Sequence, residues 1–262
     1  MKIKFAKYHG TGNDFILVDN RENIFDPTKD QIAFLCHRRF GIGADGLILL
    51  GNSEMHDFSM KYYNADGGEG SMCGNGGRCI AAFAESLGII KDVVIFEAVD
   101  GEHIAKMLAS KDELPEISLK MSDVNDIIRF GEDYVLDTGS PHLVRFVENL
   151  EKVNVYSEGK RLRWHPAFQP GGINVNFVQR SEDQLAVRSF ERGVEDITLS
   201  CGTGITACAL AASRFYPQNP GYYKILTDGG KLNVRFTKDG KRFSDIWLEG
   251  PAVKVFEGEA EI

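Results

Sequence analysis

The chain has 262 residues, of which 43% are hydrophobic and 26% charged, as is typical of a globular protein with one large or two small domains. Its formal net charge of −8 makes nucleic acid and an anionic membrane surface poor partners, so we expect neither. The N-terminus lacks the apolar segment of a signal peptide, no apolar run reaches the roughly 18 residues of a membrane span, and five cysteines cannot all pair, so we expect a cytoplasmic protein.

Short apolar runs separated by turn residues predict many β-strands. In chain order they cover residues 15–18, 47–50, 93–96, 175–178 and 231–236. Helices are fewer. Thr28 and Gln31 form a capping box ahead of an apolar face that includes Ile32, Leu35 and Cys36. Apolar residues at helical spacing predict two further helices, over about 76–87 and 204–215. Many strands with a few helices indicate the α+β class.

The two later helices begin with the same pattern. Cys73-Gly-Asn-Gly76 precedes the first, and Cys201-Gly-Thr-Gly204 precedes the second, 128 residues further on. Thr11-Gly-Asn13 and Thr138-Gly-Ser140 are separated by 127 residues, and so are Asn64 and Glu191. A nearly constant shift at several places predicts an internal duplication. We therefore expect two similar domains that meet near residue 120 and share a cleft.

A cysteine immediately before a helix faces unpaired backbone N–H groups and the positive end of the helix dipole, which lower the pKa of a thiol. Glycines in both motifs let the backbone approach a ligand, and helix-start N–H groups bind carboxylates. Two such halves placed face to face suit racemisation of an amino acid. One thiolate would remove the α-proton while the opposite thiol protonates the other face, and no cofactor is needed.

The other cysteines call for a different interpretation. Cys36, Cys79 and Cys208 lie on apolar helix faces, so we expect them in the core. The cysteine spacings of six and seven residues do not match those of zinc sites, so we expect no metal. His142, which follows Pro141, is interpreted equally well as a structural residue or as a neighbour of the ligand.

Taken together, these motifs resemble the diaminopimelate epimerase family. Six segments carry the resemblance, in the family's order: His9-Gly-Thr-Gly-Asn-Asp-Phe15, Gly41-Ile-Gly-Ala-Asp-Gly46, Tyr63-Asn-Ala-Asp-Gly67, Met72-Cys-Gly-Asn-Gly-Gly-Arg-Cys79, Phe190-Glu-Arg-Gly193 and Ser200-Cys-Gly-Thr-Gly204. The resemblance implies a PLP-independent interconversion of LL- and meso-2,6-diaminopimelate, on the route to lysine and peptidoglycan. It also implies two pseudo-symmetric domains, each a curved, mostly antiparallel sheet around a central helix, with the active site in the cleft between them. In such a fold the last strand returns to the first domain, which gives domains of 1–118 with 251–262, and of 119–250.

The resemblance also implies roles for individual residues. Cys73 would be the proton donor and Cys201 the acceptor in the LL-to-meso direction, with the roles exchanged in reverse. His142 and Glu191 match positions that are important for activity in the family. The expected partner is a small amino-acid substrate, with no cofactor and no metal, and a homodimer is the default for a soluble oligomer. The implied substrate-binding residues are Asn13, Asn64, Gly74, Asn75, Asn174, Glu191, Arg192, Gly202 and Thr203.

Three features depart from the family's pattern. Ser140-Pro-His142 stands where the family usually has Asn-Pro-His, and Gly46 stands where some members have Gln. The loop 193–200 is one residue longer than the commonest form. These departures concern the distal end of the substrate more than the thiols.

Two other functions stay open. The chain could be a related cofactor-independent racemase of proline, hydroxyproline or histidine, or a non-catalytic amino-acid-binding module. Asn64 and the 191–193 segment suit a substrate with a polar distal end, which argues against proline. The paired thiols argue against pure binding, which needs none.

Overall fold

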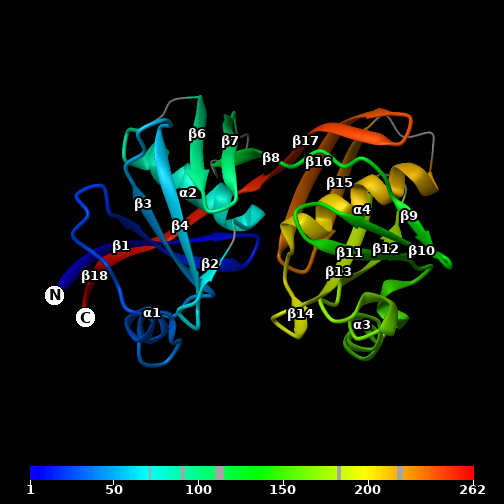
Figure 1. The fold of residues 1–262 in the computed structure, drawn as a ribbon, viewed down its shortest axis with the longest axis horizontal. Helices are drawn as coiled ribbons and strands as arrows, with labels where there is room; N and C mark the ends of the chain where they lie inside the picture. The colour runs from blue at the N-terminus through cyan, green and yellow to red at the C-terminus, as the bar shows by residue number, and fades with distance from the viewer. Residues whose placement is uncertain (71, 90–91, 110–114, 182–183, 217–220) are drawn as a thin grey trace. The chain divides into compact units, whose positions relative to one another are not determined.

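The computed structural model describes residues 1–70, 72–89, 92–109, 115–181, 184–216 and 221–262 (Figure 1). Its contacts divide the chain into two compact units. Unit 1 comprises Met1–Leu119 with Gly250–Ile262, and unit 2 comprises Lys120–Glu249. Among the described residues, no helix combines the length and the apolar character that a membrane span requires.

A curved, mostly antiparallel sheet forms the framework of unit 1. Its strands are β1 (Lys2–Gly10), β2 (Asn13–Asp19), β3 (Gly46–Gly51), β4 (Phe58–Asn64), β5 (Glu69–Gly70), β6 (Val93–Ala98), β7 (Gly101–Leu108), β8 (Glu116–Lys120) and β18 (Val253–Glu261). Their spatial order is β18, β1, β2, β3, β4, β6, β7, β8, with β5 also paired to β4. The pairs β2–β3 and β4–β6 are parallel and the others antiparallel.

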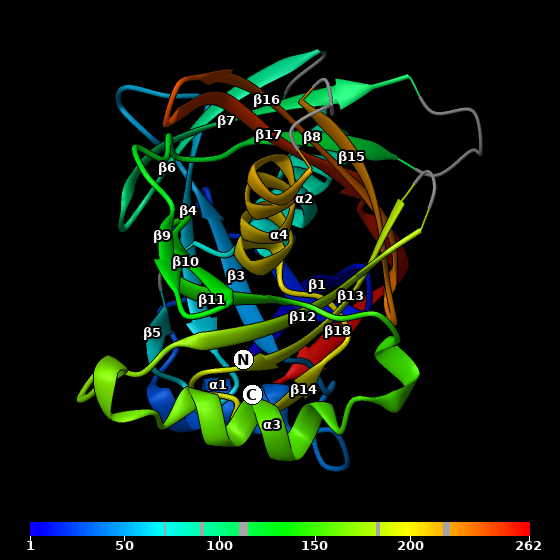
Figure 2. The ribbon, with the colours of Figure 1, turned by 90° about the vertical axis from the view of Figure 1, so that its right-hand side faces the viewer.

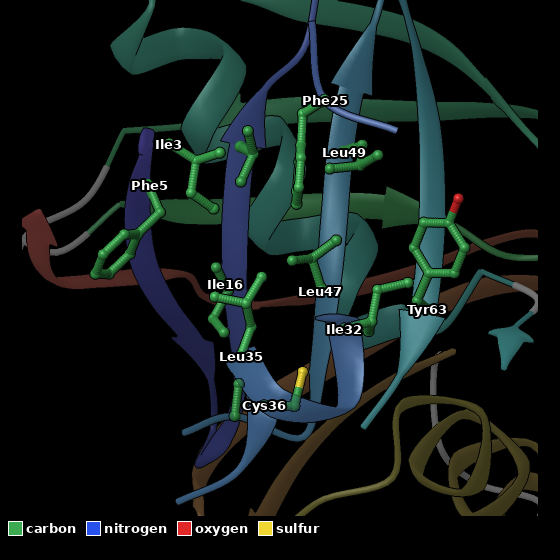
Figure 3. Packing of buried hydrophobic residues seen from close by; sticks show 12 residues of the cluster. Ile3, Phe5, Ile16, Phe25, Ile32, Leu35, Cys36, Leu47, Leu49 and Tyr63 are labelled. Atoms are coloured by element: carbon green, nitrogen blue, oxygen red, sulfur yellow. The ribbon is translucent and has the colours of Figure 1, made fainter. Parts of the chain in front are cut away.

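Helix α2 (Gly74–Ser86) is the central helix of unit 1. All its residues from Gly74 to Ala84 are buried, and it contacts β1, β2, β3 and β7. The opposite face of the sheet is covered by α1 (Lys29–Cys36), whose Ile32 and Leu35 pack against Ile16 and Leu47 (Figure 3). Because side chains alternate along a strand, β2 and β3 supply apolar residues to both helices.

Unit 2 contains nine further strands and two longer helices among its described residues. The strands are β9 (Ile128–Phe130), β10 (Asp133–Asp137), β11 (Pro141–Phe146), β12 (Asn174–Arg180), β13 (Gln184–Glu191), β14 (Asp196–Thr198), β15 (Tyr222–Thr227), β16 (Gly230–Asp239) and β17 (Arg242–Pro251). The helices are α3 (Val155–Arg163) and α4 (Gly202–Phe215), with short 3₁₀ segments η1 (Leu150–Lys152) and η2 (Pro166–Phe168). Figure 2 shows α4 enclosed by the curved sheet of this unit and α3 on its outer face.

The sheet of unit 2 repeats the topology of unit 1. Its order is β9, β10, β11, β12, β13, β15, β16, β17, with β14 beside β13, and its parallel pairs are β11–β12 and β13–β15. Each step has the same direction as its counterpart in unit 1. In this correspondence β18 takes the place of β9, so unit 1 obtains that strand from the C-terminal end of the chain. The α+β class and the internal repeat predicted from the sequence are therefore confirmed.

The three helices expected from the sequence are present as α1, α2 and α4, whereas the sequence did not indicate α3. Thr28 and Gln31 form the expected capping box at α1, and α2 and α4 begin two residues before the predicted starts. Helix α3 was missed, because its apolar face is small. Only Val155 and Leu162 bring large apolar side chains to the core from an otherwise charged segment.

Candidate active site

Cys73 is the N-cap residue of the central helix of unit 1. Its backbone is extended, with φ −109° and ψ 148°, and its sulfur accepts a hydrogen bond from the backbone N–H of Gly76 at 3.2 Å. The sulfur also lies 4.0 Å from Oδ1 of Asn13, at the start of β2. The side chain thus caps the helix start and faces an amide oxygen that can accept a hydrogen bond from the thiol.

The amide of Asn13 is oriented by a charged cluster at the end of the sheet. Its Nδ2 donates to Oδ2 of Asp45 at 2.7 Å, and Arg38 joins Asp45 to Asp14 through contacts of 2.7 Å. Lys7 approaches Asp14 at 2.7 Å. Burial would raise the pKa of Asp14, but hydrogen bonds from Arg38 and Lys7 outweigh it and lower that pKa. The cluster directs Oδ1 of Asn13 toward the helix.

Asn75 and Arg78 complete this half of the site. Nδ2 of Asn75 donates to Oδ1 of Asn13 at 3.2 Å, and Oδ1 of Asn75 accepts from Arg78 at 3.0 Å. Arg78 also donates to the carbonyl of Gly74 at 3.1 Å and is fully buried, which lowers its pKa to about 10. The first helical turn is therefore fixed by a buried cation.

Asn64 lies at the end of β4, directly across from Gly46 on β3. Its Oδ1 accepts from the hydroxyl of Tyr62 at 3.0 Å, and the side chain is exposed. A Cβ atom on Gly46 would meet the Tyr62 ring and the Tyr63 carbonyl, both at 2.5 Å. Crowding by the Tyr62 ring and the Tyr63 backbone leaves no room here for a side chain such as the Gln of some proteins in the resembling family.

Cys201 has the equivalent position in unit 2. It is the N-cap residue of α4, with φ −115° and ψ 109°, and its sulfur lies 3.6 Å from Oγ1 of Thr203. Nε2 of His142, on β11, lies 2.9 Å from the same hydroxyl oxygen. His142 is fully buried, and burial followed by the charge of Arg192 lowers its pKa to about 3. The imidazole that contacts the Thr203 hydroxyl is therefore neutral at neutral pH.

Asn174 of unit 2 forms hydrogen bonds with both Ser140 and Arg192. Its Oδ1 accepts from the backbone N–H of Arg192 at 2.9 Å, and its Nδ2 donates to Oγ of Ser140 at 2.9 Å. The guanidinium of Arg192 lies 3.4 Å from the same Ser140 oxygen. Ser140, at the place where the resembling family usually has Asn, thus contacts both Asn174 and Arg192.

Glu191 ends β13 and accepts a hydrogen bond from the Thr198 hydroxyl. The loop that follows is held by Glu195, which accepts from the backbone N–H of Gly193 at 3.1 Å and from Nε of Arg163 at 2.9 Å. Arg163 comes from the outer helix α3, so an element absent from the sequence prediction positions this loop.

The three cysteines predicted to be structural are buried in the core. Cys79 and Cys208 are 0% exposed and Cys36 is 3% exposed. Burial raises the pKa of all three thiols, that of Cys36 to about 12. Their thiols are consequently protonated at neutral pH and unsuited to nucleophilic or proton-transfer chemistry.

Solved structures with the same fold place the chain in a structural class. A Bacillus anthracis protein of the phenazine biosynthesis PhzF family matches with a TM-score of 0.80 at 16% identity, covering 100% of both chains. A probable proline racemase from Agrobacterium radiobacter matches with a TM-score of 0.71 at 15% identity, covering 99% of this chain and 92% of that one. The fold is therefore the two-domain α+β fold of PhzF and proline-racemase-type proteins.

Closer relatives are found by sequence. A family model described as diaminopimelate epimerase matches residues 5–124 and 134–255. A diaminopimelate epimerase from Flavobacterium psychrophilum is 49% identical over 97% of this chain and 99% of its own length. Another, from Chlorobaculum tepidum, is 42% identical over 95% of this chain and 98% of its own length. The chain belongs to the diaminopimelate epimerase family, and its class of enzyme is that of the isomerases.

Several residues that shape the site carried no signal of their own in the sequence. Arg38 and Lys7 are ordinary surface-type residues in the sequence until the fold places them beside Asp14, and the motif that contains Asp45 does not indicate that its carboxylate contacts Asn13. Arg78 is part of the Cys73 motif, yet nothing in the motif indicates that its guanidinium is fully buried. An arginine on an otherwise apolar helix is a weak signal that could have suggested it.

Proposed function

We propose that the chain interconverts LL- and meso-2,6-diaminopimelate by a two-base reaction that uses the thiols of Cys73 and Cys201 and no PLP. One observation carries the proposal: a cysteine caps the start of the central helix in each of two units with the same topology. Membership in the diaminopimelate epimerase family supports the substrate. The reaction requires the two sulfurs to reach opposite faces of one α-carbon when the substrate is bound.

In the LL-to-meso direction, the Cys201 thiolate takes the α-proton. The electron pair left on carbon is delocalised into the carboxylate, where backbone N–H groups at the helix starts offer stabilisation. The Cys73 thiol then gives its proton to the other face of the carbon. Each turnover exchanges a thiolate at Cys201 for one at Cys73, and the reverse reaction or proton exchange with solvent restores the first state.

Substrate binding is proposed for residues from both units. Gly74, Asn75, Gly202 and Thr203 would hold the reacting carboxylate at the helix starts. Asn13, Asn64 and Glu191 offer oxygen acceptors for ammonium groups, and Arg192 with Asn174 offers donors for the distal carboxylate. A guanidinium prefers a carboxylate because it donates two parallel hydrogen bonds. His142 contacts the hydroxyl of Thr203, and Glu191 accepts a hydrogen bond from Thr198. We propose that His142 and Glu191 influence activity through these contacts.

Isotope exchange tests the function directly. The protein is incubated in D₂O with LL-diaminopimelate, meso-diaminopimelate, proline, hydroxyproline and histidine, and deuterium at the α-carbon is followed by NMR. We expect exchange and inversion with the two diaminopimelate isomers. Exchange with proline and not with diaminopimelate would favour a related racemase. Ligand binding without any exchange, unchanged in Cys73→Ala and Cys201→Ala, would favour a binding module.

We further propose that the two units are the N- and C-terminal epimerase domains and that the enzyme is a cytoplasmic homodimer. Five cysteines cannot all form disulfides with one another, which suits a reducing compartment. The dimer is the commonest assembly of soluble oligomers. Light scattering coupled to size exclusion tests it: a mass near twice 29.1 kDa is expected, and a mass of one chain at micromolar concentration would contradict it.

A further inference from the structure

Behind His142 lies a short chain of polar side chains, all buried in unit 2. Nδ2 of Asn176 lies 3.2 Å from Nδ1 of His142 and donates to the carbonyl of Leu143 at 3.1 Å. Oδ1 of Asn176 accepts from the hydroxyl of Ser189 at 2.8 Å. Asn176 and His142 are 0% exposed and Ser189 is 4% exposed, so their polar atoms satisfy each other inside the protein.

The orientation of the Asn176 amide follows from its neighbours. The Leu143 carbonyl can only accept a hydrogen bond, so the group that faces it must be the NH₂ of Asn176. The same NH₂ faces Nδ1 of His142, which must then be the unprotonated ring nitrogen. A neutral imidazole with a bare Nδ1 carries its proton on Nε2. Burial lowers the pKa of His142 to about 3, and the charge of Arg192, which directly follows β13, acts in the same direction.

The position of the proton on His142 affects the thiol of Cys201 through Thr203. With its proton on Nε2, His142 donates to Oγ1 of Thr203 at 2.9 Å. The threonine hydroxyl then has its own proton free for another acceptor, and the sulfur of Cys201 lies 3.6 Å from that oxygen. A hydrogen bond donated to sulfur stabilises the thiolate relative to the thiol.

In unit 1 the positions that match Asn176 and His142 hold apolar side chains. Ser189 is the cross-strand partner of Asn176, and Tyr62 is that of Ile48 at the matching place. A Cβ on Gly204 would lie 2.5 Å from Oδ1 of Asn176, and a Cβ on Gly76 would lie 3.2 Å from Cδ1 of Ile48. The fold therefore accepts an aliphatic residue beneath the first turn of the central helix.

His142 has a similar apolar counterpart. The matching residue of β2 is Phe15, which lies beside Gly46 as His142 lies beside Asn174, and its ring packs on Tyr62 at 5.9 Å. Since the topology is satisfied by apolar side chains in one unit, the polar ones in the other call for a different reason.

We propose that Asn176 is a positioning residue that holds His142 in the Nε2–H form, so that the Thr203 hydroxyl donates to the sulfur of Cys201 and favours its thiolate. The inference rests on the proposed role of Cys201 as a base. The buried polar side chains of His142, Asn176 and Ser189 belong to unit 2, whose Cys201 must start as the thiolate in the LL-to-meso direction.

The test measures the imidazole itself and the thiol, not turnover. Nitrogen-15 NMR of histidine-labelled protein reports which ring nitrogen of His142 carries the proton, and iodoacetamide labelling with peptide mass spectrometry reports the thiolate at each cysteine. In the parent protein we expect the Nε2–H form throughout pH 5–9. In Asn176→Leu we expect loss of that single form and about fivefold slower labelling of Cys201 at pH 7, the effect of one hydrogen bond. Labelling of Cys73 should be unchanged.

The matched control is Ile48→Val, at the equivalent place in unit 1, which should leave both readouts at Cys201 and His142 as in the parent. If Asn176→Leu does not fold, Asn176→Asp replaces the donor by an acceptor with almost the same shape, and His142 should then be protonated on Nδ1. An Nε2–H imidazole and unchanged Cys201 labelling in Asn176→Leu, or a bare Nδ1 in Asn176→Asp, would overturn the proposal. The tautomer of His142 and the labelling rate of Cys201 are both measured without diaminopimelate. A failed epimerase assay would therefore not contradict the role of Asn176, and a failed Asn176 test would not contradict the epimerase activity.

Discussion

Asp45 accepts a hydrogen bond of 2.7 Å from the side-chain amide of Asn13, although the two residues are 32 positions apart in the chain. The contact decides which way the amide of Asn13 faces, because the NH₂ is engaged by the carboxylate and Oδ1 is left to accept from Asn75. Arg38 in turn neutralises Asp45. The sulfur of Cys73 therefore meets an oxygen, not a nitrogen, at 4.0 Å.

Removing that carboxylate should cost activity without unfolding the protein. In Asp45→Ala the amide of Asn13 is free to rotate, and we expect kcat/KM for LL-diaminopimelate to fall about tenfold, the loss of one charge-assisted hydrogen bond. The matched control is Asp126→Ala, since Asp126 is also ion-paired and its side chain is 46% exposed against 44% for Asp45. Steady-state kinetics with equal losses in both variants would contradict a specific role for Asp45.

The two N-cap cysteines should be indispensable, and the core cysteines should not. Cys73→Ala and Cys201→Ala each remove one of the two proton-transfer groups, so we expect epimerisation to fall about 10³-fold. Cys36→Ala serves as the control, because it removes a thiol from the core beneath α1. That variant should lose some stability and keep its kcat. A normal kcat in either N-cap variant would rule out the two-base reaction.

Oxidation tests whether the thiols of Cys73 and Cys201 can approach each other. The proposed reaction requires the two sulfurs to flank one carbon of the substrate, and we expect sulfurs so arranged to be able to bond to each other when no substrate is present. We expect mild oxidation to inactivate the enzyme through a Cys73–Cys201 disulfide and thiol reductant to restore it. Cys36, Cys79 and Cys208 should stay reduced, since they are at most 3% exposed. Peptide mass spectrometry of the inactivated protein would refute the prediction if it found no such link.

Acidification should destabilise the fold through His142. Its pKa is about 3 in the folded protein and about 6.5 as an ordinary histidine, so below pH 6.5 the unfolded chain takes up a proton that the folded chain refuses. The free energy of unfolding therefore decreases as pH falls from about 6.5 to about 3, by up to about 1.4 kcal/mol per pH unit.

Urea titrations at pH 7.5 and pH 5 measure this loss. His142→Gln should be less stable than the parent at pH 7.5 but should lose less stability on going to pH 5. The exposed His37 provides the control variant, His37→Gln, which should behave as the parent does. An equal loss in the parent and in His142→Gln would show that another group carries the pH dependence.

Local patterns in the sequence were sufficient for much of the fold and for the centre of the site. Turn residues and apolar spacing located five of the described strands and the two cysteine-led helices, because these signals act within one turn or one strand. The repeat distance of 127–128 residues predicted the duplication that the two sheets share. Helix α3 lay beyond such rules, because its few apolar residues acquire meaning only against β12 and β13.

Sequence motifs alone predicted two cysteines at helix starts with glycines around them, and they indicated the family to which the chain belongs. The side chains that support each cysteine could be identified only in the folded protein. Unit 1 supports Cys73 with Asn13 and the buried Arg78, whereas unit 2 supports Cys201 with Thr203 and His142. The physical reason is that hydrogen bonds between side chains depend on distance and direction in space, which strand pairing and helix packing set between residues far apart in the chain.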